Sequence, residues 1–384
     1  MARRRVETAV SQTVDRNQPP EVFGQVAKLL ESSGCVDQML MWDQLVSWIA
    51  PCLWTPENSP LAKVVTDLDS YPDWNVMCGY GAAVAPKLGT VISTDALRIP
   101  PAEKMQTMLT LANATNGKAT YQVGAGEVKQ CKPYGHKRVE GLDRLEDFYR
   151  AFHAFWENDE PFNLEGHHLK FDRAWLGKSR RHKPRLWGLG GGPRVYDLAT
   201  TYADGFSTMG VMVWTSPEHA AQEIKKLKQQ LESKGRDPEK FDFSVWAPLL
   251  LHEDREVVER AFENPIVKWT TCIMGRIIQS EWLKEGIQPP MPADWHYALK
   301  MLPQNIGLAE ANEMMSRVTP QMSHKSWIYG DAKKAAAELQ GFIDAGVTHV
   351  AMIDMIPALL DPEASGQAIT RSIDVCRHIK AANA

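Results

Sequence analysis

The sequence has few of the features that mark secreted, disulfide-bonded or membrane proteins. Its six cysteines are scattered along 384 residues with no CxxC pair, which is typical of a reducing, cytoplasmic setting. No apolar run approaches the ~20 residues that a membrane span needs. The basic start, MARRRVETAV, lacks the apolar core and cleavage site of a signal peptide. These absences predict a soluble, cytoplasmic protein with no integral membrane segment.

Charge and motifs exclude further classes of function. The net charge of -4 argues against nucleic acid as the main partner and favours a small molecule. No HExxH, zinc-type cysteine pair or GxSxG occurs, so we expect neither a metal site nor a serine hydrolase. His167 and His168, in EGHHLKF, are interpreted as solvated. The thirteen tryptophans are unusual, and aromatic residues gathered at one end of a barrel would line an apolar pocket.

Apolar periodicity predicts eight strands that alternate with eight helices. The predicted strands span residues 6–12, 36–42, 88–94, 119–123, 185–189, 206–209, 241–251 and 348–353. This pattern predicts an α/β fold, one (β/α)₈ TIM barrel over residues 1–384, with its active site at the carboxyl ends of the strands. Residues 264–325 break the alternation after strand seven and are predicted to form a helical insertion. The alternative is an open doubly wound sheet, which commonly has fewer strands.

The segment 183–209 combines a strand, three glycines and a helix that opens at proline. Glycines let the backbone approach a ligand, and the free N–H groups and dipole of the helix then attract an anion. The residues of this expected phosphate cradle are Gly190, Gly191, Gly192, Pro193 and Arg194. The segment is neither GxGxxG nor a Walker motif, so a tight turn with no ligand is equally consistent with these residues alone. The basic run 177–185, GKSRRHKPR, is most often a solvated loop, but beside the cradle it could hold an acidic cofactor tail.

Polar residues follow the predicted strands and should converge on one face of the barrel. They include Asp43, Gln44 and Trp48 after strand two, Thr94 at the end of strand three, and Gly126, Glu127 and Gln130 after strand four. Asp43 and Glu127 could form a carboxylate pair for acid–base work, as in a glycosidase. Two facing carboxylates would not, however, need a phosphate cradle.

Four segments carry a family resemblance: MWDQLVSW, LGTVISTD, QVGAGEVKQCKPYG and PRLWGLGGGPRVYDLATTYADGF. Together they resemble the luciferase-like monooxygenase superfamily, and more closely its branch that uses the deazaflavin coenzyme F-420. The likeness spans residues 6 to about 381, and residues 266–304 look most like the phthiodiolone ketoreductase group. The resemblance implies a homodimeric oxidoreductase that transfers a hydride between F-420 and a lipophilic carbonyl or unsaturated substrate.

The resemblance also implies roles for individual residues. The cofactor phosphate would be bound by Gly190, Gly191, Gly192, Pro193 and Arg194. The deazaflavin ring would lie on Val91 and Ile92, at a cis-peptide bulge, and the ring or its ribityl chain would contact Asp43, Thr94, Gly126 and Gln130. Glu127 and Trp48 would be catalytic. The usual histidine after Asp43 is Gln44 here. Glutamine can donate a hydrogen bond to an oxyanion but cannot shuttle a proton near neutral pH.

Two other functions remain open at this stage. A monooxygenase that uses FMN needs the same cradle, although such members more often carry a small or basic residue in place of Glu127. A catalytically silent binder of a flavin or lipid would be consistent with Gln44. Glucose-6-phosphate is not expected as a substrate, because the chain past strand six, TMGVMVW, is apolar where a sugar phosphate would need cations.

Overall fold

A closed ring of eight parallel strands forms the centre of the protein. The computed structural model describes residues 5–13 and 15–384, so residues 1–4 of the basic start considered above lie outside the described part. The ring consists of β1 (Glu7–Ser11), β2 (Gln38–Trp42), β3 (Gly89–Asp95), β4 (Ala119–Gly124), β7 (Arg185–Leu189), β8 (Gly205–Met209), β9 (Asp242–Leu251) and β11 (His349–Asp354). Strand β11 pairs with both β9 and β1 and thereby closes the ring. The predicted (β/α)₈ barrel is confirmed.

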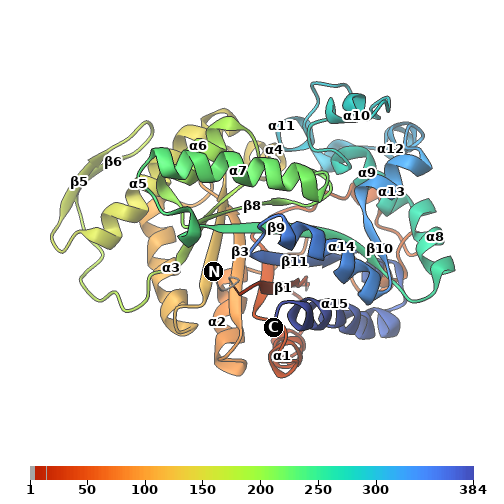
Figure 1. Ribbon diagram of the computed structural model, residues 1–384, viewed down its shortest axis with the longest axis horizontal. Coiled ribbons are helices and arrows are strands. Elements are labelled where there is room, and N and C mark those ends of the chain that lie inside the picture. The colour runs from red at the N-terminus through yellow and green to blue at the C-terminus, as the bar shows by residue number, and fades with distance from the viewer. Residues whose placement is uncertain (1–4, 14) are drawn as a thin grey trace.

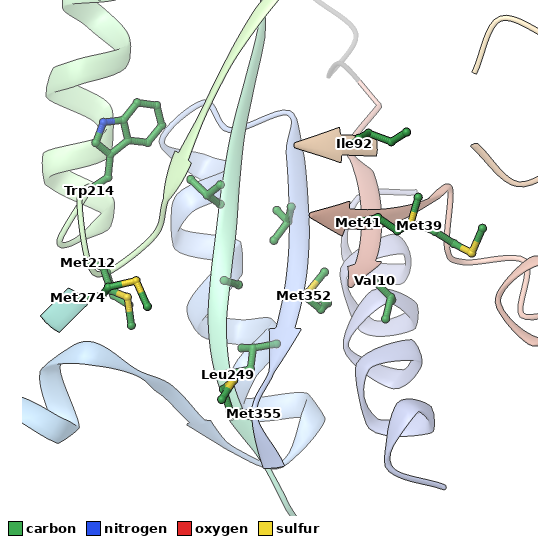
Figure 2. Close-up of a cluster of buried hydrophobic side chains, with 14 of the residues drawn as sticks. Val10, Met39, Met41, Ile92, Met212, Trp214, Leu249, Met274, Met352 and Met355 are labelled. Carbon is green, nitrogen blue, oxygen red and sulfur yellow. The ribbon is translucent and has the colours of Figure 1, made fainter. Parts of the chain in front are cut away.

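Helices surround the strands (Figure 1). They are α1 (Pro20–Ser32), α2 (Trp74–Val84), α3 (Pro101–Ala114), α5 (Gly141–Glu157), α6 (Pro193–Tyr202), α7 (Pro217–Ser233), α8 (Arg255–Glu263), α14 (Ala332–Asp344) and α15 (Pro362–Ala382). Apolar side chains fill the space between strands and helices, and Figure 2 shows Val10, Met39, Met41 and Met352 in this cluster. No helix of the described residues is long and apolar enough to cross a membrane.

Side chains from alternate positions of the strands fill the barrel interior. At the amino end, Nη1 of Arg185 lies 2.8 Å from Oε2 of Glu7, and its Nε donates to Oγ1 of Thr120 at 3.0 Å. Above this charged layer, an apolar cluster includes Leu40, Val91 and other residues of β1, β2, β3 and β11. The barrel is therefore packed at its amino end, and space for a ligand is found at its carboxyl end.

Two short strands between α5 and β7 were not predicted. Strands β5 (Phe162–Glu165) and β6 (Lys170–Ala174) form an antiparallel hairpin inside a polar segment. Their side chains are mostly exposed, so they lack the apolar run that marks the barrel strands. His167 and His168 lie at the hairpin turn, where their backbone N–H groups donate to the carboxylate of Asp147 at 2.8 and 2.6 Å. Among the described residues no group of three His, Cys, Asp or Glu could hold a metal ion.

The region after α8 carries its own helices before the barrel pattern resumes. These are α9 (Pro265–Met274), α10 (Glu281–Lys284), α11 (Tyr297–Lys300), α12 (Leu308–Met315) and α13 (Pro320–Ser326), followed by β10 (Ile328–Gly330), which pairs with the end of β9. Nε1 of Trp269, on α9, donates to the backbone oxygen of Trp48 at 2.8 Å. This region is thereby joined to the loop after β2, at the carboxyl end of the barrel.

Candidate active site

A cavity of about 390 Å³ opens at the carboxyl ends of β2, β3, β4, β7 and β8. The predicted site residues that line it are Asp43, Gln44, Thr94, Gly126, Glu127, Gln130, Gly190, Gly191 and Gly192. These residues come from four separate strand-to-helix connections. The structure thus brings most of the predicted site together at the predicted end of the barrel.

Five predicted residues do not line this cavity, and two of them, Pro193 and Arg194, directly follow the glycines at the start of α6. Trp48 lines a smaller adjoining pocket of about 60 Å³. Val91 belongs to the apolar cluster inside the barrel, and Ile92 points to the opposite side, into the cluster beneath the helices. Neither lines the large cavity. Every peptide bond between described residues is trans, so the cis-peptide bulge expected at Val91 and Ile92 is absent from this part of the chain.

The glycine turn has the backbone geometry of an anion cradle. Gly190 and Gly192 have φ values of +135° and +97°, which side chains of L-residues rarely adopt. Helix α6 begins at Pro193 directly after Gly192, and no side chain caps it. The first backbone N–H groups of a helix have no partner within the helix, so this end presents donors to a ligand. The guanidinium of Arg194 is ion-paired with Asp143, so its charge is engaged by the protein.

The basic run 177–185 lies far from this cradle, so the idea that it could hold an acidic cofactor tail is wrong. Arg185 begins β7 in the charged layer at the amino end of the barrel. Arg180 donates to the backbone oxygen of Phe155 near the end of α5 at 2.9 Å. A strand rises by about 3.3 Å per residue, so β7 places its two ends on opposite sides of the barrel.

Asp43 and Thr94 form a rigid charged cluster at one side of the cavity. Oγ1 of Thr94 donates to Oδ2 of Asp43 at 2.6 Å, and Nη2 of Arg98 lies 3.1 Å from the same oxygen. Nζ of Lys104 donates to Oγ1 of Thr94 at 2.8 Å. Burial alone would raise the pKa of Asp95, but the charges of Arg98 and Lys104 outweigh it and lower that pKa.

Glu127 lies between an ammonium group and a phenol. Nζ of Lys129 is 2.8 Å from Oε2, and the hydroxyl of Tyr297 donates to Oε1 at 2.7 Å. Burial would raise the pKa of Glu127, but the charge of Lys129 and the hydrogen bonds from Lys129 and Tyr297 outweigh it, so the pKa is lowered. Glu127 is therefore a carboxylate near neutral pH. Glu127 is thus not the protonated acid that a glycosidase requires, and Asp43 is ion-paired with Arg98.

Several residues of the site were missed in the sequence. They are Arg98, Lys104, Lys129, Arg138, Trp246, Ile277, His296 and Tyr297. Lys129 follows Glu127 by two residues, and this short spacing could have indicated that the two are near each other. His296 and Tyr297 come from the region after α8, and nothing local in the sequence connects them to Glu127. Burial, followed by the charge of Arg138, lowers the pKa of His296.

The smaller pocket has mostly apolar walls and adjoins the larger cavity. The two share Gln44, Glu127, Met209, Trp246 and Tyr297. Its other walls are Trp42, Trp48, Lys129, Met212, Pro248, Thr270, Met274, Trp327, Ile353 and Met355. Part of the unusual tryptophan content thus gathers at one end of the barrel, as the sequence suggested.

The fold and the site together define a TIM-barrel enzyme with a glycine turn and a paired carboxylate in one cavity. A model of the luciferase-like monooxygenase family matches residues 53–349, and the chain belongs to this family. It is an oxidoreductase of that family, and the resemblance drawn from the four sequence segments is confirmed.

Known relatives share most of the length of the chain. A phthiodiolone/phenolphthiodiolone dimycocerosates ketoreductase of Mycobacterium kansasii is 25% identical over 325 residues, which cover 83% of this chain and 87% of the relative. An F420-dependent glucose-6-phosphate dehydrogenase of Kineococcus radiotolerans is 24% identical over 271 residues, or 69% of this chain and 71% of the relative. The fold is also that of an F420-dependent secondary alcohol dehydrogenase solved with an F420-acetone adduct, with a TM-score of 0.72, 18% identity and 99% of both chains covered.

Proposed function

We propose that the protein is an F-420-dependent oxidoreductase that transfers a hydride between the deazaflavin and an apolar carbonyl or unsaturated substrate. One observation carries the proposal. A single cavity joins the glycine cradle at one side to the pair Glu127–Lys129 at the other, next to an apolar pocket. The curated relatives, a ketoreductase and an F420-dependent dehydrogenase, support the same chemistry.

The residues of the cavity fit a cofactor with a phosphate and a flat ring. Gly190, Gly191 and Gly192 would hold the phosphate through the backbone. The guanidinium of Arg138 also lines the cavity, and its buried Nε has no hydrogen-bond partner among the described residues, which favours an anionic ligand. Apolar walls lie between, from Leu189, Val195, Met209, Trp246 and Ile277. When bound, the deazaflavin supplies the carbon that donates or accepts the hydride.

The protein would bind the substrate in the smaller pocket and exchange a proton with the substrate oxygen. Methionine and tryptophan side chains exclude water there and favour an apolar group. Lys129, the lysine that lines this pocket, is paired with Glu127 and is therefore not available for a sugar phosphate. Glu127, which is ionised, would accept a proton from an alcohol or return it through the bonded Tyr297. Gln44 would contact the substrate oxygen.

The test is a pair of equilibrium titrations of the purified protein, one with F-420 and one with FMN, followed by cofactor fluorescence. We expect tight binding of F-420 and weak binding of FMN, and then oxidation of reduced F-420 by apolar ketones. The opposite preference, with oxygen consumption in the presence of reduced FMN, would assign the protein to the monooxygenases. Binding of neither would reduce the cradle to an ordinary turn.

A further inference from the structure

We propose that Lys129 is a positioning residue that turns Gln44 into a fixed hydrogen-bond donor for the substrate oxygen. The inference rests on the proposed function and deepens it. Lys129 and the amide of Gln44 would together take the role of the histidine that the family resemblance leads one to expect after Asp43.

The ammonium group of Lys129 is buried among three oxygen atoms of the protein. Its side chain is 2% exposed, and Nζ lies 2.8 Å from Oε2 of Glu127, 3.0 Å from the backbone oxygen of Val46 and 3.3 Å from Oε1 of Gln44. An ammonium has three N–H donors, and three acceptors surround it here. Two of these contacts are hydrogen bonds and the third, to Glu127, is an ion pair, so the protein itself holds the ammonium group and Lys129 acts through its neighbours.

This contact decides which way the amide of Gln44 points. A lysine ammonium can only donate, so the amide oxygen must face Lys129 and the NH₂ group must face away from it. The two ends of an amide are assigned from such partners. Nε2 of Gln44 has no hydrogen-bond partner among the described residues. Because Gln44 lines both the large cavity and the apolar pocket, its NH₂ group lies where cofactor and substrate would meet.

The arrangement separates two tasks that one histidine could combine. Gln44 donates a hydrogen bond to a carbonyl or alkoxide oxygen and transfers no proton. Proton exchange is left to Glu127, which Lys129 and Tyr297 keep ionised and oriented. Lys129 serves both tasks, since it contacts the amide and the carboxylate at the same time.

The test measures the carbonyl stretch of an isotope-labelled ketone, 2-butanone, bound to protein that is loaded with oxidised F-420 and cannot reduce it. In the wild type the hydrogen bond from Gln44 should lower this infrared frequency relative to the ketone in an apolar solvent. In Gln44→Leu and in Lys129→Met the frequency should return toward that value. Because the substrate oxygen loses its oriented donor in both variants, kcat/KM should fall by about 10²-fold.

The double variant distinguishes positioning from a separate contribution. If Lys129 acts through Gln44, Gln44→Leu combined with Lys129→Met should shift the carbonyl band no further than Gln44→Leu alone. A frequency that is unchanged in Lys129→Met, or shifts that add in the double variant, would overturn the inference. Should Lys129→Met fail to fold, Lys129→Leu, which likewise has no donor, takes its place, with the same outcomes.

Controls keep this inference apart from the proposed function. Lys268→Met removes a lysine of α9 that is ion-paired with Glu263 outside both pockets, and should leave the band and kcat/KM unchanged. F-420 affinity of the wild type is measured first. If F-420 does not bind, the proposed function fails; if it binds and is turned over while Lys129→Met behaves as wild type, only the role of Lys129 fails.

Discussion

At the scale of single residues, the charge state of Glu127 is set by a hydroxyl group that comes from far along the chain. Tyr297 donates to Glu127 across 170 positions of sequence at 2.7 Å. Tyr297→Phe removes one of the causes that lower the pKa of Glu127, so that pKa should rise. In alcohol oxidation, where Glu127 must be ionised to accept the proton, the acid limb of the kcat/KM profile should therefore move to higher pH.

The size of this effect follows from one charged hydrogen bond. Without the hydrogen bond from Tyr297, the ionised form of Glu127 is about 1.5 kcal/mol less stable. This corresponds to roughly tenfold lower kcat/KM on the acid limb, with little change at alkaline pH. Lys129, Asp95, Arg138 and His296 also act on Glu127 or Tyr297 and remain in place. Tyr329→Phe, on β10 outside both pockets, is the matched control. A uniform loss of activity at every pH would contradict the assignment.

The residues around Glu127 show how much of the site the sequence could predict. Glu127 and Gln44 directly follow barrel strands, so their place was predictable once the strands were recognised. Lys129 lies two residues from Glu127, yet its contact with Gln44 spans 85 positions. Tyr297 lies in a region with no strand of the barrel to place it. Contacts of this kind depend on the packed fold, which local residue patterns do not encode.

At the scale of elements, the junction of β7 and α6 should determine whether a phosphate is bound. Gly192→Ala places a side chain on a backbone with φ of +97°, although nothing lies within 4 Å of the added carbon. Strain of about 1–3 kcal/mol would push the turn out of shape and misdirect the N–H groups of α6. We expect F-420 affinity to fall about tenfold or more, while a deazaflavin that lacks the phosphate should bind as before.

Gly177→Ala is the control for this prediction. Gly177 also has a positive φ, +83°, with nothing near its added carbon, but it lies in the basic run away from the cavity. It should share any cost in stability and leave cofactor binding unchanged. Equal loss of F-420 and of the phosphate-free deazaflavin in Gly192→Ala would show that the turn supports the ring rather than the phosphate.

Elements with a buried apolar face were predictable, and exposed ones were not. All seven residues of β3 are buried, and the β-branched threonine, valine and isoleucine residues of LGTVIST favour a strand. The hairpin of β5 and β6 is polar and leaves no such pattern. The start of α2 is set by a single side chain: the carboxylate of Asp73 accepts from the N–H groups of Asn75 and Val76, and the helix begins at Trp74.

At the scale of the whole molecule, the barrel contains a buried polar network on one side. Oγ of Ser244 lies 2.8 Å from Nδ1 of His349 and 3.1 Å from Oγ of Ser207, so the network joins β8, β9 and β11. His349 is 1% exposed and packs edge-on against Trp187 at 5.0 Å. A histidine held this way is uncharged in the folded protein, and the stability of the barrel should therefore depend on pH.

The sign and size of that dependence follow from the pKa of His349. Burial, followed by the charge of Arg185, lowers this pKa to about 3, whereas a histidine of the unfolded chain has a pKa of about 6.5. Between these two values only the unfolded state binds the proton, so stability is complete above pH ~6.5 and falls by up to about 1.4 kcal/mol per pH unit below it. Urea unfolding at pH 7 and pH 5 should show a loss about 2 kcal/mol larger in the wild type than in His349→Asn, which cannot take up this proton. The control His378→Asn, at an exposed position of α15, should lose as much stability between pH 7 and pH 5 as the wild type. An equal pH dependence of His349→Asn and the wild type would mean that His349 is not the group that titrates.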